Sequence, residues 1–263
     1  MAEMKVQVLL SCMNQQDCSI VERTNIQTDA VVVNQCNNDS ITEYDFINKN
    51  SQKCHVKFIN TTEKGLSRSR NMAIVNATGD YCLICDDDEN LDDNYAATIL
   101  KGFEDNPQYD IIAFKLDFSE LTFSDKEYNV NYLNAGRLAS VQMAFKNNEL
   151  IRSTPFNIKM GSGTGNGCGE ENKFVLDCLK KGARIKYVPS YIAYVATGSS
   201  LWFKGYTEKY WVDRGWIAKM LYGKFWGAIY LIYQILCRVR KLDKKNSVLN
   251  ILKWMVRGFK QDR

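Results

Sequence analysis

The sequence predicts an α/β fold in which helices flank a mostly parallel central sheet, followed by a helical extension. Two observations predict it. Over about the first 195 residues, short apolar runs rich in β-branched residues alternate with stretches of helical pattern, which is typical of βαβ units. From about residue 201 the chain turns aromatic, basic and helical. A chain of 263 residues can bury a substantial core in the first part and still carry this appendage.

Each expected element has its own signal in the sequence. Apolar runs bounded by turn residues predict the strands, and longer periodic stretches predict the helices. Because ligands of parallel α/β sheets bind at the carboxyl ends of the strands, the residues that follow each strand are the first candidates for a site. The predicted strands are residues 5–11, 30–33, 55–59, 81–85, 111–116, 139–145 and 187–195, and the predicted helices are 66–76, 94–103 and 170–181, with a further helix possible between the first two strands.

Composition indicates an ordinary folded protein of a reducing compartment. Hydrophobic residues make up 45% and charged residues 24%, with 3 prolines and no internal repeat. The apolar segment at the amino end is too short for a signal peptide and lacks a cleavage site, so we expect the chain in the cytosol. Nine irregularly spaced cysteines favour free thiols over a disulfide framework. Cys82 and Cys85 form a CxxC pattern, but three residues apart on a strand they face opposite sides, which disfavours a metal site there.

The acidic run Asp86-Asp87-Asp88-Glu89 directly follows the apolar strand 81–85. Like charges repel one another unless a cation or a ligand offsets the repulsion. Asp86 and Asp88, two residues apart, point the same way from the strand end, and carboxylate oxygens suit Mg²⁺ or Mn²⁺ shared with substrate phosphates. The alternative is a solvated acidic turn before the next helix, where acids also interact well with the helix dipole.

A second candidate lies just upstream, in residues 63–73. Here Gly65, two serines, Arg68 and Arg70 surround the start of a predicted helix, and Asn71 follows. Backbone N–H groups at a helix start and guanidinium groups both bind anions. By itself this signal is weak.

Four features, taken together in their order along the chain, resemble the pattern of glycosyltransferase family 2. They are a glycine, an Arg-Asn pair that opens a helix, a Gly-acid-Tyr segment at 79–81 and a strand that ends in Asp-x-Asp. The resemblance covers about the first 195 residues and implies the GT-A fold. It also implies an inverting, metal-dependent transfer from a nucleotide-sugar donor that is a UDP-sugar. It further implies a catalytic domain at 1–200, with a donor half at about 1–105 and an acceptor half at about 106–200. We place the boundary to the helical extension, 201–263, near residues 198–204.

The resemblance also implies roles for individual residues. Asp88 corresponds to the direct ligand of Mn²⁺ or Mg²⁺, with Asp86 near the ribose and as a second ligand. Asn34-Gln35 stand where the family usually has two acids, and an amide can hydrogen-bond a uracil edge. The residues implied to bind the nucleotide sugar are Ser11, Asn14, Gln35, Gly65, Arg70, Asn71, Asp86 and Asp87.

Gly169-Glu170-Glu171 resembles the Gly-Glu-Asp segment of the family, with Glu171 at the position of the aspartate. That acid is implied to be the general base that takes the proton of the acceptor hydroxyl during a single in-line displacement. Glutamate is one methylene longer than aspartate, so Glu170 remains a competitor. The structural alternative is that both acids stabilise the start of helix 170–181.

Two other features receive a structural interpretation. The single histidine, His55, is expected at a strand edge and not as a ligand. The glycines between 161 and 169 contain GxGxxG-like spacings but follow no strand of a βαβ unit, so we expect a mobile loop near the acceptor instead of a dinucleotide site.

The extension differs in charge from the rest of the chain. Residues 201–263 hold 14 Lys and Arg against 4 Asp and Glu, a net charge of +10, while the first 200 residues carry −6. Residues 225–237 are uncharged, but as a helix they would span about 20 Å, less than the roughly 30 Å of a bilayer core. Basic and aromatic flanks predict a segment lying on an anionic membrane surface. In residues 248–260 we expect one apolar face, made of Val248, Leu252, Met255, Val256 and Phe259, and one polar face, made of Asn250, Lys253, Arg257 and Lys260.

We therefore expect a transferase that extends a lipid-linked glycan of a cell-surface polysaccharide on the cytoplasmic face of the membrane, with no nucleic-acid partner. Three alternatives remain. The extension could instead pack on the catalytic domain or on a second subunit. A sugar nucleotidyltransferase has a similar sheet, but it needs a glycine- and basic-rich loop after the first strand, where this chain has Ser11-Cys-Met-Asn-Gln-Gln. A non-enzymatic membrane adaptor would tolerate loss of Asp86, Asp88 and Glu171.

Overall fold

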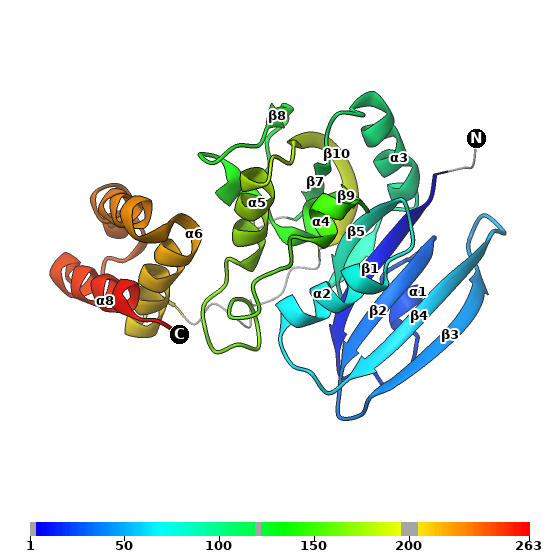
Figure 1. Cartoon of the computed structure of the whole chain (residues 1–263), viewed down its shortest axis with the longest axis horizontal. Helices are drawn as coiled ribbons and strands as arrows, with labels where there is room; N and C mark the ends of the chain where they lie inside the picture. Colours follow the sequence, from blue (N-terminus) through cyan, green and yellow to red (C-terminus); the bar gives the residue numbers. More distant parts are fainter. Residues whose placement is uncertain (1–3, 119–121, 196–204) are drawn as a thin grey trace.

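The computed structural model describes residues 4–118, 122–195 and 205–263. Its centre is a ten-stranded mixed sheet with the order β3-β4-β2-β1-β5-β9-β7-β10-β6, in which β8 also pairs with β10 (Figure 1). The pairs β1–β2, β1–β5, β2–β4 and β7–β10 are parallel. The predicted α/β class is therefore confirmed, but the sheet is mixed and not mostly parallel, because β3–β4, β5–β9, β7–β9, β10–β6 and β10–β8 are antiparallel.

The elements follow the predicted alternation with small shifts at their ends. The strands are β1 (Val6–Met13), β2 (Asp29–Gln35), β3 (Ser40–Ile47), β4 (Lys53–Thr61), β5 (Tyr81–Asp86), β6 (Glu89–Leu91), β7 (Ile111–Asp117), β8 (Tyr128–Asn129), β9 (Met143–Lys146) and β10 (Ile185–Val195). The α-helices are α1 (Ile20–Arg23), α2 (Leu66–Asn76), α3 (Tyr95–Asp105), α4 (Glu149–Arg152), α5 (Glu170–Lys180), α6 (Glu208–Gln234), α7 (Arg240–Leu242) and α8 (Val248–Lys260), and short 3₁₀ or π turns lie at Ala135–Arg137, Ser140–Gln142 and Ile235–Val239.

Each face of the sheet has its own hydrophobic core. One core lies on the side of α2 and α5, and the other lies on the side of α1 and α3. Cys82 belongs to the first core and Cys85 to the second. The two cysteines therefore face opposite sides of β5, as the strand periodicity predicted. Because both faces are covered, the central strands are apolar throughout rather than alternating.

The carboxyl ends of β1, β2 and β5 meet at one edge of the sheet. In the register of these strands Ser11 is paired with Asp86, and Met13 with Gln35. Parallel pairing thus brings Ser11, Gln35 and Asp86, three of the residues expected at the donor site, to one edge of the sheet.

Two expectations about strands were wrong. Strand β3 pairs antiparallel with β4 and forms the edge of the sheet. It was missing from the predicted strands, which were recognised as apolar runs, because half of its residues are polar. His55 consequently lies on an inner strand, although its side chain is exposed, with Nδ1 3.0 Å from Asp45 Oδ1. Residues 139–145 are not one strand, because a 3₁₀ turn at Ser140–Gln142 precedes β9.

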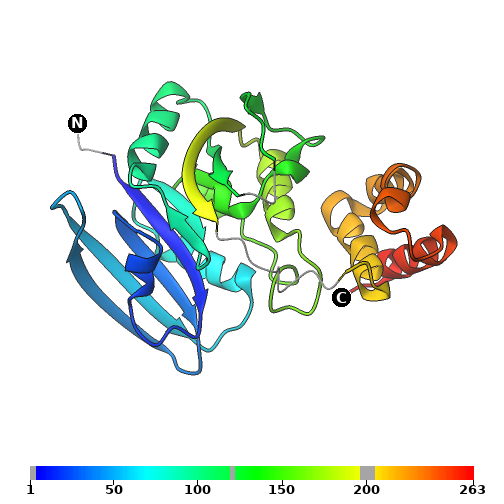
Figure 2. The ribbon, with the colours of Figure 1, turned by 180° about the vertical axis from the view of Figure 1, so that it is seen from behind.

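The C-terminal helices form a small unit beside α5, at the opposite end of the molecule from β3 (Figures 1 and 2). Helix α6 is broken at Gly223, whose φ of 73° and ψ of −173° are not helical. The first segment of α6 crosses α8 so closely that a Cβ on Gly215 or Gly258 would overlap the backbone of the other helix. Small residues at a crossing allow this approach, which fixes α8 on α6.

The expected apolar face of α8 was partly wrong. The buried residues of this helix are Ile251, Met255 and Gly258, whereas Leu252 and Val256 stay 37% and 36% exposed. The buried stripe is displaced because α8 packs through Gly258 against α6. The expected polar face is exposed throughout. No helix within the described residues is both long and apolar enough to cross a bilayer, and the expected boundary at 198–204 lies outside those residues.

Candidate functional site

The acidic run forms the turn that connects β5 to β6 at the carboxyl edge of the sheet. Asp86 ends β5 and Glu89 opens β6, which pairs antiparallel with β10. Asp86 is partly buried, Asp87 and Asp88 are exposed, and Glu89 is 4% exposed. The exposed carboxylates of Asp87 and Asp88 thus lie between the partly buried Asp86 and the buried Glu89.

Arg70 of α2 lies at the centre of a buried ion network. One guanidinium nitrogen, Nη2, donates to both carboxylate oxygens of Asp86 at 2.9 and 3.0 Å. The other, Nη1, donates to Glu170 Oε1 at 3.2 Å. Arg70 is 2% exposed and Glu170 5% exposed. A buried arginine between two carboxylates offsets charge that would otherwise be costly to bury, and here it joins the end of β5 to the start of α5.

Burial and mutual repulsion act on the remaining acids of the turn. The pKa values of Asp87 and Asp88 are raised, mainly because both groups lose solvent and secondarily because Asp86 lies close. Burial raises the pKa of Glu89 well above its usual range, with Asp86 and Asp88 adding to the effect. Neither carboxylate oxygen of Glu89 has a hydrogen-bond partner among the described residues. The turn therefore gathers four carboxyl groups, of which Asp86 is bonded to Arg70 and the other three lie in a setting that favours their neutral forms.

This donor set fits a hard divalent cation that also takes oxygens from its substrate. Within the described residues, no group of three or more Asp, Glu, His or Cys side chains converges into a complete metal site. Mg²⁺ and Mn²⁺ are commonly held by one or two carboxylates together with water and substrate phosphates. Asp88, exposed beside Asp86, is placed to supply such an oxygen.

The polar residues after β1 and β2 mostly stabilise their own loops. Gln35 is buried and its Oε1 accepts a hydrogen bond from the backbone N–H of Gly65 at 2.7 Å. Asn34 accepts from Gln15 N and donates to Gln15 O, both at 3.0 Å. Their amides thus hold the loop after β1 and the start of α2, a role the sequence did not reveal.

Three other predicted donor residues lie in different environments. Ser11 is buried, and its hydroxyl has no partner within the described part of the chain. Asn14 is exposed and has a φ of 52°, the left-handed conformation that asparagine tolerates. The side-chain amide of Asn71 donates from Nδ2 to Phe156 O at 2.9 Å and accepts at Oδ1 from Phe156 N at 2.7 Å. It therefore connects α2 to the segment after α4.

Glu170 and Glu171 open α5 directly after the glycine-rich loop. Glu170 Oε2 accepts from the N–H of Gly169 at 3.0 Å, so this carboxylate is committed to the loop on one side and to Arg70 on the other. Glu171 makes no such ion pair with any residue that the structure describes. Burial, followed by repulsion from Glu170, raises the pKa of Glu171 to about 8. Of the two acids, Glu171 is therefore the one suited to accept a proton near neutral pH.

The glycine-rich loop, residues 160–169, lies against the start of α2. Leu66 N donates to Ser162 O at 3.0 Å, and Ser67 Oγ donates to Met160 O at 2.9 Å. A Cβ on Gly163 would lie 3.1 Å from the Cα of Gly65. The backbones can approach this closely because Gly163 lacks a side chain, whereas at Gly65 it is the φ of 122° that favours glycine.

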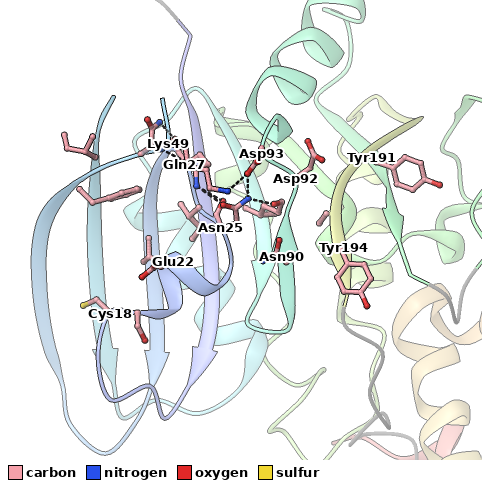
Figure 3. A pocket seen from close by; sticks show the side chains of 18 of the residues that line it. Cys18, Glu22, Asn25, Gln27, Lys49, Asn90, Asp92, Asp93, Tyr191 and Tyr194 are labelled. Carbon is pink, nitrogen blue, oxygen red and sulfur yellow. Dashed lines mark hydrogen bonds and ion pairs between the residues drawn. The ribbon is translucent and has the colours of Figure 1, made fainter. Parts of the chain in front are cut away.

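A groove of about 1180 Å³ lies on the other face of the sheet, walled by α1, β3, β6 and β10. Asp93 accepts hydrogen bonds there from Asn25 at 2.8 Å and Lys49 at 2.6 Å (Figure 3). Among the described residues, none of the predicted site residues lines this groove. It is separate from the network around Arg70.

The chain was compared with known proteins at the levels of family, sequence and structure. The family model for glycosyl transferase family 2 matches residues 7–168. No match was found among curated proteins. Among solved structures, residues 1–349 of S. aureus TarS in complex with UDP-GlcNAc superpose with a TM-score of 0.62 and 14% identity, covering 97% of this chain and 81% of that one. The complex of the same protein with UDP gives a TM-score of 0.60 and 16% identity, over 95% and 78% of the two chains.

More than half of the chain matches the family model, and the folds agree along nearly the whole chain. The expected GT-A-like fold is thus confirmed. This chain belongs to glycosyl transferase family 2.

Proposed function

We propose that the chain is an inverting glycosyltransferase that moves a sugar from a UDP-sugar to a glycan acceptor. One observation carries the proposal: Arg70 joins Asp86, at the strand end expected to hold the donor, to Glu170, beside the expected base Glu171. The arrangement brings a donor-side acid and an acceptor-side acid to one edge of the sheet. Family membership favours this function over a nucleotidyltransferase or an adaptor.

In this proposal Glu171 accepts the proton of the acceptor hydroxyl while that oxygen bonds to the anomeric carbon. The bond from the anomeric carbon to the diphosphate breaks in the same step, and the configuration inverts. Glu170 keeps the loop and Arg70 in place but does not take the proton, because both of its oxygens are already engaged. Ser11, Asn14 and Gly65 border the expected position of the nucleotide.

We further propose that Asp88, with Asp86, holds Mn²⁺ or Mg²⁺, which would neutralise the charge that develops on the diphosphate. The support is geometric: Asp86, Asp87 and Asp88 lie in one turn, Asp87 and Asp88 are exposed, and Glu89 beside them has two carboxylate oxygens with no hydrogen-bond partner among the described residues. Asp87 remains a proposed donor contact.

The proposed acceptor is a lipid-linked glycan at an anionic membrane surface on the cytoplasmic side. The support is a set of exposed apolar side chains on the C-terminal unit, in a region whose net charge is +10. We call this the apolar patch of α6 and α8. Its members are Phe225, Trp226, Ile229, Ile232, Tyr233 and Leu236 of α6 and the turn after it, and Leu249, Leu252 and Val256 of α8.

A screen of nucleotide sugars for binding and for donor hydrolysis, with and without Mn²⁺, tests the proposal. Binding and slow hydrolysis of at least one UDP-sugar, both dependent on the metal, are expected. If no nucleotide sugar binds to the folded protein in either condition, the proposed function is wrong.

A further inference from the structure

The C-terminal unit contacts the glycine-rich loop that leads to Glu171. Trp216 and Ile217 of α6 are buried in one cluster with Met160 at the start of that loop. A Cβ on Gly167 would lie 2.8 Å from Cδ1 of Ile217 and 3.1 Å from Cβ of Asp213. The middle of the loop therefore lies in van der Waals contact with α6.

Hydrogen bonds and ion pairs from the C-terminal unit also hold the same loop. Lys209 Nζ donates to Gly165 O at 2.8 Å and to Asp213 Oδ2 at 2.6 Å. Arg263 Nη1 lies 2.6 Å from Asp213 Oδ1 and 3.0 Å from Asn166 Oδ1. Asp213 therefore links two cations, Lys209 and Arg263, that each hold the loop. Because Asp213 is only 7% exposed, solvent screens its charge little.

The loop is thus held from two sides. The start of α2 binds Met160 and Ser162. From the other side, Lys209 of α6 binds Gly165, Ile217 of α6 contacts Gly167, and Arg263 after α8 binds Asn166. Three residues further on, the chain enters α5 at Glu170 and Glu171. A displacement of the loop by about 1 Å would move the base by a similar distance, and misplacements of this size can cost on the order of 100-fold in rate.

We propose that Asp213 and Ile217 are positioning residues, which hold the glycine-rich loop so that Glu171 meets the acceptor hydroxyl. The helical unit is then part of the active site and not only an appendage. The expected effect on turnover rests on the proposed function. The positioning of the loop can be measured without any enzymatic activity, by hydrogen exchange of its amides.

The first test is Asp213→Asn, which keeps the size of the side chain and removes its charge. Hydrogen exchange of the amides of residues 160–169 should become faster, while exchange in β5 stays unchanged. Turnover should fall about 10- to 100-fold with the affinity for UDP near wild type. The control is Arg257→Gln, which breaks an exposed pair with Glu208 in the same unit and should change none of these quantities.

The second test is a rescue. In Gly167→Ala the new methyl meets Cδ1 of Ile217, so turnover should fall, and Ile217→Val, which removes that atom, should restore it in the double variant. Unchanged loop exchange in Asp213→Asn, or additive losses in the double variant, would overturn the inference. If Asp213→Asn makes loop exchange faster but the wild-type protein binds no nucleotide sugar, the positioning role stands and only the proposed function is refuted.

Discussion

Arg70 and Glu170, one hundred residues apart in the sequence, form a buried ion pair with 3.2 Å between Nη1 and Oε1. The same guanidinium holds Asp86. Since α2 belongs to the predicted donor half and α5 to the predicted acceptor half, one side chain fixes the distance between the two sides of the site. Its surroundings make it sensitive to substitution.

Replacing Arg70 should destabilise the whole domain. Arg70→Met would leave Asp86 and Glu170 facing each other without a cation, and breaking a buried pair in this way costs about 3–5 kcal/mol. Arg68→Met is the matched control on the same helix, because Arg68 is exposed and lies 3.7 Å from an exposed Glu63, a contact worth under about 1 kcal/mol. Denaturant unfolding of both variants measures the difference. Equal losses in both would mean that the buried network carries no stability.

The network also shows how far the sequence could predict the site. The strands whose carboxyl-terminal parts hold Ser11, Gln35 and Asp86 were predictable, because the apolar runs that identify them are local and regular signals. Which groups bond one another was not. The contacts of Gln35 with Gly65 and of Asn71 with Phe156 join segments 30 and 85 residues apart, and residue types alone do not encode such pairings. The same holds for the contact of α6 with the loop.

Asp88 is predicted to carry the metal dependence. Asp88→Asn removes one of few oxygen charges at the diphosphate, so binding of a UDP-sugar should no longer respond to Mn²⁺. The measurement is a thermal-shift titration with UDP, with and without Mn²⁺. Asp93→Asn, in the separate groove, serves as the control and should keep the Mn²⁺ response. Full activity of Asp88→Asn in the presence of a chelator contradicts the metal assignment.

Glu171 and Glu170 should separate in their effects on turnover. Glu171→Gln keeps the size of the side chain but cannot accept a proton, so we expect a fall of about 100- to 10,000-fold in kcat with donor affinity near wild type. Glu170→Gln should instead lower stability, because Arg70 loses half of its compensation. Steady-state kinetics and denaturant unfolding of both variants show which acid acts as the base and which one stabilises the fold. If Glu170→Gln shows the larger kinetic loss, the base is Glu170.

The raised pKa of Glu171 predicts a pH dependence with a definite sign. Only the ionised form accepts a proton, so kcat/KM should rise with pH through about 8. The fold favours the protonated form, so the contribution of Glu171 to the free energy of unfolding is present below the ordinary pKa of glutamate and is lost as pH rises through about 8. Unfolding at pH 6 and pH 9 should show wild type losing more stability than Glu171→Gln. An identical loss in both proteins assigns the effect to other groups.

The apolar patch of α6 and α8 is predicted to bind anionic membranes reversibly. Phe225 and Trp226 are 70% and 65% exposed, so replacing both with serine removes apolar contact area without opening the core. Each basic residue near an anionic surface contributes roughly 1 kcal/mol before screening, so Lys244→Glu with Lys245→Glu should weaken binding at low salt and matter less at high salt.

Substitution of exposed side chains is a better test of this anchor than deletion of the unit, because α6 also packs on the loop that leads to Glu171. Co-sedimentation with anionic vesicles over a salt series, for wild type and both double variants, measures the anchor. Val75→Ser is the control, since Val75 is 73% exposed on α2 and lies outside the patch. The Phe225 and Trp226 double variant should lose vesicle binding, and the lysine double variant should bind more weakly at low salt. Both should keep their affinity for UDP, because neither touches the network around Arg70. Binding equal to wild type in both double variants would exclude a membrane role for the patch.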